Sequence, residues 1–182
     1  MHGPASPGWL LVALCAATGA YCLLRMRSPV AEQRRTAGGE AIMGFGMAAM
    51  AVPAAVVTPP RWAWIACAVV FGATALRALG AARGSPHHLH HLMGTFAMVY
   101  MAAVMTAAPA HHLHGGTGVP VITGALLLYF AGYVLRSGLR LLPLAVASGA
   151  AERTVGWGDR PELSQACRLS MGIAMLAMLV TL

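Results

Sequence analysis

Six long apolar stretches occupy most of this 182-residue chain, and they constrain its fold more than any other feature. A helix that crosses a bilayer needs about 20 mostly apolar residues. The stretches that qualify are about 8–26, 39–58, 62–81, 88–108, 118–142 and 164–182. Only 9% of the residues are charged, whereas a soluble domain carries about 25%. We therefore expect an all-α, polytopic membrane bundle with six transmembrane helices, forming a single integral membrane domain over residues 1–182.

The twelve basic residues are all arginine, and their positions predict the orientation of the bundle. Eleven lie in or beside the loops after the first, third and fifth stretches, and Arg61 stands alone on the other side. Because basic residues collect in cytoplasmic loops, both termini should be extracytoplasmic in the cell membrane. No basic residue precedes the first stretch, so we expect it to be retained as a helix rather than cleaved. This loop placement also argues against a nucleic-acid partner, and the lack of lysine and asparagine indicates an actinobacterial source.

Methionines recur on one face of three stretches. Ten of the twelve lie in the second, fourth and sixth stretches, at Met43, Met47, Met50, Met93, Met98, Met101, Met105, Met171, Met175 and Met178. At 100° per residue they form one stripe on each helix, which in the fourth stretch holds Met98, Met101 and Met105. All three helices should run from the cytoplasm outward. We therefore expect three antiparallel helix hairpins whose second helices bring Met47, Met101 and Met175 to a common interior.

The stripes have two interpretations, and both remain open. Methionine fills irregular gaps in helical cores, and the small residues between the methionines suit close helix packing. Thioethers also bind Cu(I) well and hard cations poorly, so the stripes are a candidate path for copper. The candidate thioether ligands are Met43, Met47, Met98, Met101, Met105, Met171 and Met175.

Seven of the eight histidines lie at the two ends of the fourth stretch. The inner group is His87, His88, His90 and His91, and the outer group is His111, His112 and His114. His87 and His91 are one helical turn apart, a spacing that lets two imidazoles share a metal ion. Both groups are candidate metal ligands, and the inner group is also a candidate for proton transfer. A simple polar turn is the alternative for the outer group.

Glu40 begins the second stretch, at the expected membrane level of the inner histidines. A carboxylate at that depth is costly unless another group satisfies it. One expected partner is Arg168, which would make a structural clasp between two helices. The other is His87 or His91 with Met43 close behind, which would make a mixed site for copper or for proton transfer. We favour the mixed site and include Glu40 among the candidate ligands.

Four segments carry a resemblance to a known family. They are His-His-Leu-His-His-Leu-Met (87–93), Met-Val-Tyr-Met (98–101), Leu-Leu-Leu-Tyr-Phe-Ala-Gly-Tyr-Val-Leu-Arg (126–136) and Cys-Arg-Leu-Ser-Met-Gly (167–172). Over nearly its whole length the chain resembles an uncharacterised family of small actinobacterial integral membrane proteins, and this resemblance implies no function. The spacing Met-x-x-x-Met is similar to that in the pore helix of copper-uptake transporters, and it occurs at Met43/Met47, Met101/Met105 and Met171/Met175. Those transporters take one such helix from each of three subunits, so this second likeness implies only ligand chemistry.

Three functions fit these features. The leading one is a membrane copper-handling protein that binds or transports Cu ions through Met and His sites. The second is a membrane redox or metal-dependent enzyme subunit with a His/Met-ligated cofactor; copper is preferred to haem because the membrane-proximal histidines belong to one helix. The third is a structural or assembly subunit without metal, whose partner is another membrane protein or a second copy of the chain. The chain has no nucleophile motif or phosphate-binding loop, which favours a non-enzymatic protein.

Overall fold

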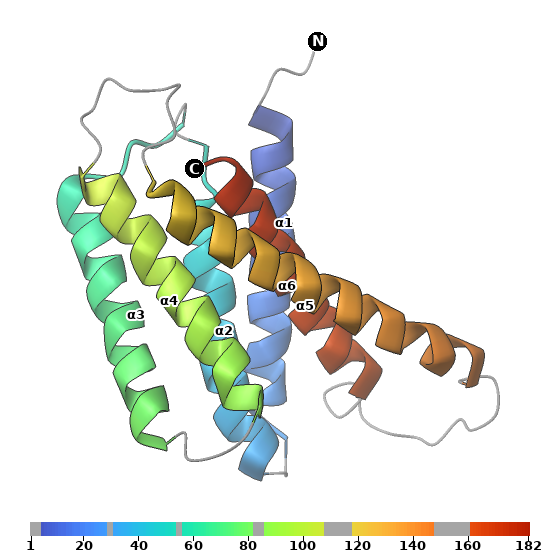
Figure 1. The fold of residues 1–182 in the computed structure, drawn as a ribbon. Helices are drawn as coiled ribbons and strands as arrows, with labels where there is room; N and C mark the ends of the chain where they lie inside the picture. Colours follow the sequence, from blue (N-terminus) through green and yellow to red (C-terminus); the bar gives the residue numbers. More distant parts are fainter. Residues whose placement is uncertain (1–4, 29–30, 54–55, 82–85, 108–117, 148–160) are drawn as a thin grey trace.

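The chain folds into three antiparallel helix hairpins (Figure 1). The structure is a computed structural model, and it describes residues 5–28, 31–53, 56–81, 86–107, 118–147 and 161–182. The helices are α1 (Ala5–Arg25), α2 (Ala31–Met50), α3 (Arg61–Ala81), α4 (Pro86–Ala107), α5 (Pro120–Ala147) and α6 (Pro161–Val180). No strand occurs in these described ranges, so the all-α prediction is confirmed for them.

Prolines mark the beginnings of four helices. α4, α5 and α6 begin at Pro86, Pro120 and Pro161, and Pro60 directly precedes α3. Proline suits the first turn because its fixed φ angle is helical and the N–H that it lacks would have no partner there. These four helices therefore begin within a few residues of their predicted starts.

α2 lies earlier in the chain than the apolar stretch predicted. The expected helix was 39–58, whereas α2 runs from Ala31 to Met50. Its C-terminal limit is set by Pro53, because a proline disfavours the helical conformation of the residue before it, here Val52. Its first turns are the polar run Glu32-Gln33-Arg34-Arg35. As a result, Glu40 lies inside the helix rather than in its first turn.

Four helices are long and apolar enough to cross a membrane. The segments are Pro7–Arg25 of α1, Leu89–Ala107 of α4, Pro120–Leu139 of α5 and Leu163–Val180 of α6. α2 and α3 are not among them within the described residues, so the prediction of six spanning helices is matched only in part. For α2 the polar first turns explain the difference. Four such helices are consistent with a membrane protein.

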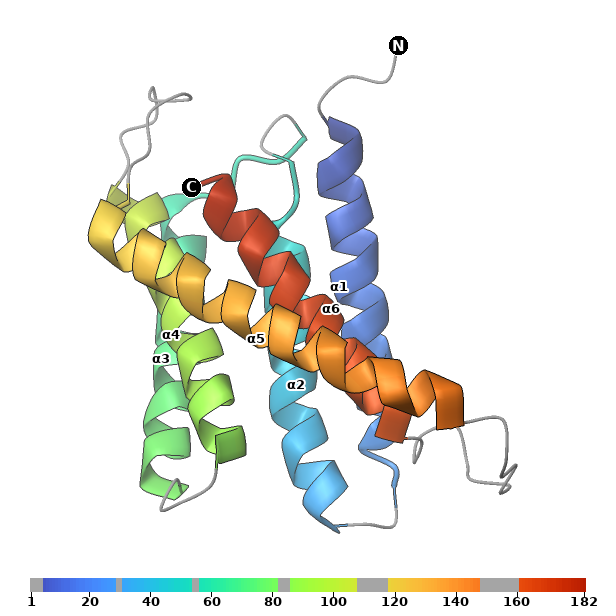
Figure 2. The same cartoon turned by 45° about the vertical axis from the view of Figure 1, so that its right-hand side comes forward.

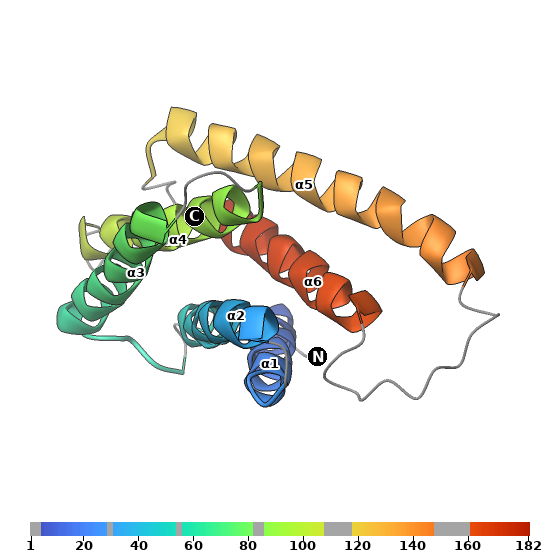
Figure 3. The ribbon, with the colours of Figure 1, turned by 90° about the horizontal axis from the view of Figure 1, so that it is seen from below.

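The second helix of each hairpin faces the centre of the molecule. α2, α4 and α6 contact one another, while α1, α3 and α5 lie on the outside against their hairpin partners (Figure 3). α1 also packs against α6. α5 lies along the outer side of α6 and is strongly inclined to the upright helices α1, α2 and α3, as Figure 2 shows. The start of α1 lies at the same end of the molecule as the end of α6.

A pair of glycines brings α1 and α2 close together. A Cβ atom added to Gly44 would lie 2.9 Å from the Cα of Gly19 and 3.2 Å from the carbonyl oxygen of Cys15. Only residues without side chains allow two helix backbones to approach this closely. This contact makes α1 and α2 a tight hairpin.

Candidate functional site

Methionines from all three inner helices meet in one buried core. The seven members are Met43 and Met47 of α2, Met98 and Met101 of α4, and Met171, Met175 and Met178 of α6. Met47 and Met98 are fully buried, and Met175 is 1% exposed. The prediction that Met47, Met101 and Met175 share a common interior is confirmed.

Glycines on the inner helices make room for these thioethers. A Cβ atom at Gly94 of α4 would lie 2.8 Å from the methyl carbon of Met43. A Cβ atom at Gly46 of α2 would meet the ring of Phe71 first and would lie 3.2 Å from the methyl carbon of Met98. Each methionine therefore reaches across to the backbone of the neighbouring helix. The small residues between the methionines of a stripe serve this close packing.

A cavity adjoins the methionine core near the C-terminal end of α6. Its lining residues are Met50, Trp64, Met101, Met105, Met178, Thr181 and Leu182. Met105 was a predicted ligand, but it is 40% exposed and does not belong to the core cluster. Met50 and Met178 lie on the predicted stripes although they were not assigned as ligands, and Trp64 was missed because its helix carries no stripe. Met101 lines the cavity and is also a member of the core.

Toward the other end of the inner helices, Glu40 forms a clasp with two arginines. Its Oε2 accepts a hydrogen bond from Nη1 of Arg25 at 2.8 Å, and its Oε1 accepts one from Nε of Arg168 at 2.7 Å. The side chain of Glu40 is 8% exposed and that of Arg25 is 5% exposed. The Sγ of Cys22 lies 3.8 Å from Oε2 as a weaker donor. The clasp thus joins α1, α2 and α6 through one carboxylate.

The contact between Glu40 and Arg168 was one of the two predicted outcomes, and it is confirmed. Both carboxylate oxygens of Glu40 bond to arginines, as in the structural clasp. The favoured mixed site with His87 or His91 stays a prediction. Arg25 was missed as a partner, since the sequence placed it in a loop. Its position in the last turn of α1 is a signal that could have found it, because basic residues favour helix C-termini.

The inner histidines that the structure describes point to different neighbours. The ring of His90 stacks on Tyr133 of α5 with centroids 3.6 Å apart, and its Nδ1 lies 3.4 Å from the hydroxyl of Tyr129. His91 instead lies against α2, where a Cβ at Gly39 would be 2.6 Å from its Nε2 atom. Consecutive helical residues point about 100° apart, so His90 and His91 do not converge.

Five further histidines were predicted as ligands. The side chains of His87 and His88, and the whole of His111, His112 and His114, lie outside the described residues. Among the His, Cys, Asp and Glu side chains that are described, no three come together as a metal-binding group. The thioethers are therefore the predicted ligands that the described structure brings together.

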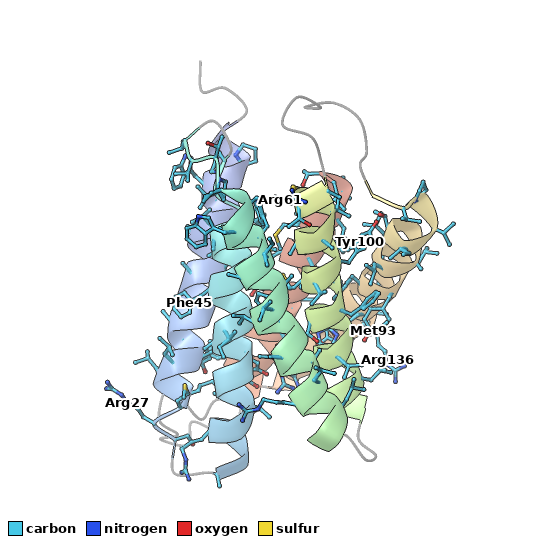
Figure 4. All side chains as sticks on the ribbon, turned by 90° about the vertical axis from the view of Figure 1, so that its left-hand side faces the viewer. Arg27, Phe45, Arg61, Met93, Tyr100 and Arg136 are labelled. Carbon is cyan, nitrogen blue, oxygen red and sulfur yellow. The ribbon has the colours of Figure 1, made fainter. Side chains whose placement is uncertain are left out.

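Figure 4 places two labelled arginines at opposite ends of the molecule. Arg27 lies near the turn that follows α1, and Arg61 lies at the start of α3 at the far end. Arg25, Arg27 and Arg34 all belong to the first hairpin's turn region. This distribution follows the asymmetry that the sequence predicted.

Comparison with known protein families relates the chain to other proteins. No curated protein matches it, and no solved structure matches it. A domain family described as Domain of unknown function (DUF5134) matches residues 32–182. The match covers the methionine core, Glu40 and Arg168, and it leaves α1 outside. The chain therefore belongs to the DUF5134 family, whose function is unknown.

Proposed function

We propose that this protein handles copper in the membrane by binding Cu(I) ions at the thioethers of its core. The observation that carries the proposal is the convergence of methionines from α2, α4 and α6 in one buried cluster. Thioether sulfur is a soft, neutral ligand that selects Cu(I) over the hard cations of the cell. Side chains from three separate helices supply the several ligands that such an ion needs.

The proposal includes a membrane placement. All six helices cross the cell membrane, and both termini are extracytoplasmic. The support is the pairing of every helix into a hairpin and the separation of Arg27 from Arg61 (Figure 4). Because cytoplasmic loops carry the excess of arginine, the end with Arg27 faces the cytoplasm. The clasp of Glu40 then lies on the cytoplasmic side of the methionine core.

A second candidate function is a structural or assembly subunit that uses no metal. The clasp favours it, because both oxygens of Glu40 are engaged by arginines and unavailable to a metal ion. Under this alternative the methionines only fill the core. The two candidates differ in a property that can be measured, the Cu(I) content of the purified protein.

The test compares the wild-type protein with the variant Met47→Leu/Met98→Leu/Met175→Leu. These residues come from the three inner helices and are at most 1% exposed. Leucine nearly conserves the volume of methionine, so the core should still pack. Tag-free protein is equilibrated with Cu(I) without oxygen, and bound metal is measured against a competing chelator. We expect about one Cu(I) ion per wild-type chain and a loss of this ion in the variant.

Met26→Leu is the matched control, because this methionine is 43% exposed and lies outside the core. It should keep the full Cu(I) content. A wild-type protein that binds no Cu(I), or a triple variant that binds as much as the wild type, would overturn the copper proposal in favour of the structural subunit.

A further inference from the structure

The cavity at the outer end of the inner helices has the chemistry of a soft-metal site. It measures about 60 Å³ and is lined by four methionines, Met50, Met101, Met105 and Met178, from three helices. Trp64 of α3 completes one side. A single water needs about 10–15 Å³ of such space, so the cavity can hold one cation and residual water.

Thioethers make up most of the side chains of the lining. None of the seven lining residues has a charged side chain, and the hydroxyl of Thr181 donates a hydrogen bond to the carbonyl of Met178 at 2.8 Å. Hard divalent cations take several oxygen ligands, whereas four of these seven side chains are thioethers. Four neutral thioethers suit a monovalent soft ion, and the face of an indole ring attracts a cation as well.

We infer that this cavity is the site where Cu(I) enters the protein from the extracytoplasmic side. The inference rests on the proposed function and adds the place of capture. Met105 is 40% exposed, whereas Met101 and Met178 are 4% and 8% exposed. The thioethers thus lead from the surface to the buried core, and Met101 belongs to both. The ion passes from the cavity to the core by exchange of one thioether for another, and it remains Cu(I) throughout.

The first test uses Ag(I), a soft monovalent ion that does not change its oxidation state, as the probe. Met50→Leu/Met105→Leu removes one ligand that packs against the edge of the core cluster and one that lies outside it. Leucine nearly conserves the volume of methionine, so the packing should be retained. We expect this variant to bind the first Ag(I) ion at least roughly tenfold more weakly than wild type. Met26→Leu should bind as wild type does.

The outcomes distinguish a failure of the capture site in the cavity from a failure of copper binding in the core. If Met50→Leu/Met105→Leu binds Ag(I) and Cu(I) as tightly as wild type while the triple core variant loses its ion, the cavity is not the capture site and the copper function stands. If wild-type protein binds neither ion, both proposals fall.

A second test needs no variant and therefore does not depend on how a substitution folds. Met105 and Met26 have similar exposures of 40% and 43%, so mild peroxide should oxidise both thioethers. Bound Ag(I) should protect Met105 and leave Met26 reactive, as measured on the peptides by mass spectrometry. Equal oxidation of Met105 with and without Ag(I) would overturn the capture site.

Discussion

Glu40 is a single residue that joins three helices, and its removal should be costly. The substitution Glu40→Gln leaves Arg25 and Arg168 without a counter-charge, although Arg25 is almost completely buried. Losing one partner of a buried ion pair costs about 3–5 kcal/mol, because the remaining charge stays unpaired. We expect the free energy of unfolding to fall by about this amount, measured by thermal unfolding of the detergent-solubilised protein.

Two variants control this prediction. Arg27→Gln removes an exposed arginine beside the clasp and should change stability by less than about 0.5 kcal/mol. Replacing Arg25, Glu40 and Arg168 together by leucine should recover most of the loss, because no buried charge is then unpaired. An unfolding midpoint of Glu40→Gln equal to that of wild type would show that the clasp contributes no stability.

The sequence predicted which polar residues belong to the site more reliably than it predicted which of their side chains are in contact. The cost of burying Glu40 predicted a charged partner, and Arg168 was found from its matching depth. Arg25 was not found, because the arginine pattern assigned it to a loop rather than to the end of α1. His90 and His91 were grouped by proximity in the chain, yet their side chains reach α5 and α2 respectively.

Among the elements, the crossing of α1 and α2 depends on Gly44. Its substitution by alanine places a Cβ atom 2.9 Å from the backbone of Gly19, so the helices must separate. Overpacking of this kind costs about 1–3 kcal/mol. Thermal unfolding should therefore show a lower midpoint for Gly44→Ala.

Gly72 of α3 provides the comparison for Gly44, because a Cβ atom there would meet no other atom within 4 Å. Gly72→Ala should leave the midpoint unchanged or raise it, since alanine favours a helix by about 1 kcal/mol over glycine. Equal effects of the two substitutions would mean that the α1–α2 contact is looser than described.

The ends of the helices were predictable where a change in hydropathy within a few residues marks them. Apolar length alone located α3, α4, α5 and α6 to within about five residues, and the structure shows that prolines mark where these helices begin. α2 was misplaced because hydropathy counts Val56 and Val57 as spanning residues, although Pro53 separates them from the helix. α2 also begins earlier in the chain than predicted, because its first turns are polar. A search for apolar stretches does not detect such turns.

For the whole molecule, the proposed membrane placement predicts a definite topology. Both ends of the chain should lie outside the cell, and the turn between α1 and α2 should lie inside. A fluorescent protein that matures only in the cytoplasm should therefore be bright when inserted after Arg27 and dark when fused after Leu182. An exported phosphatase should give the opposite pattern at the two positions, and fluorescence at Leu182 would contradict this topology.

The hairpin plan itself was predicted from the alternation of methionine-rich and methionine-poor stretches. What the sequence could not provide was the angle of α5, which lies along the outer side of α6 (Figures 2 and 3). α5 has 28 residues and is about 42 Å long at 1.5 Å per residue, more than the roughly 30 Å hydrocarbon layer. Contacts such as the stack of His90 on Tyr133 decide its direction, and these depend on the assembled bundle.

The clasp also has a consequence for the order in which the protein is made. Arg25 and Glu40 lie on consecutive helices, so under the proposed membrane placement the first hairpin can enter the bilayer with its carboxylate already neutralised. Arg168 is synthesised more than a hundred residues later, on the last helix. Until it arrives, the methionine face of the first hairpin can rest against lipid tails at little cost, because a thioether is apolar. α6 thus completes both the core and the clasp, and its arrival locks α1, α2 and α6 together.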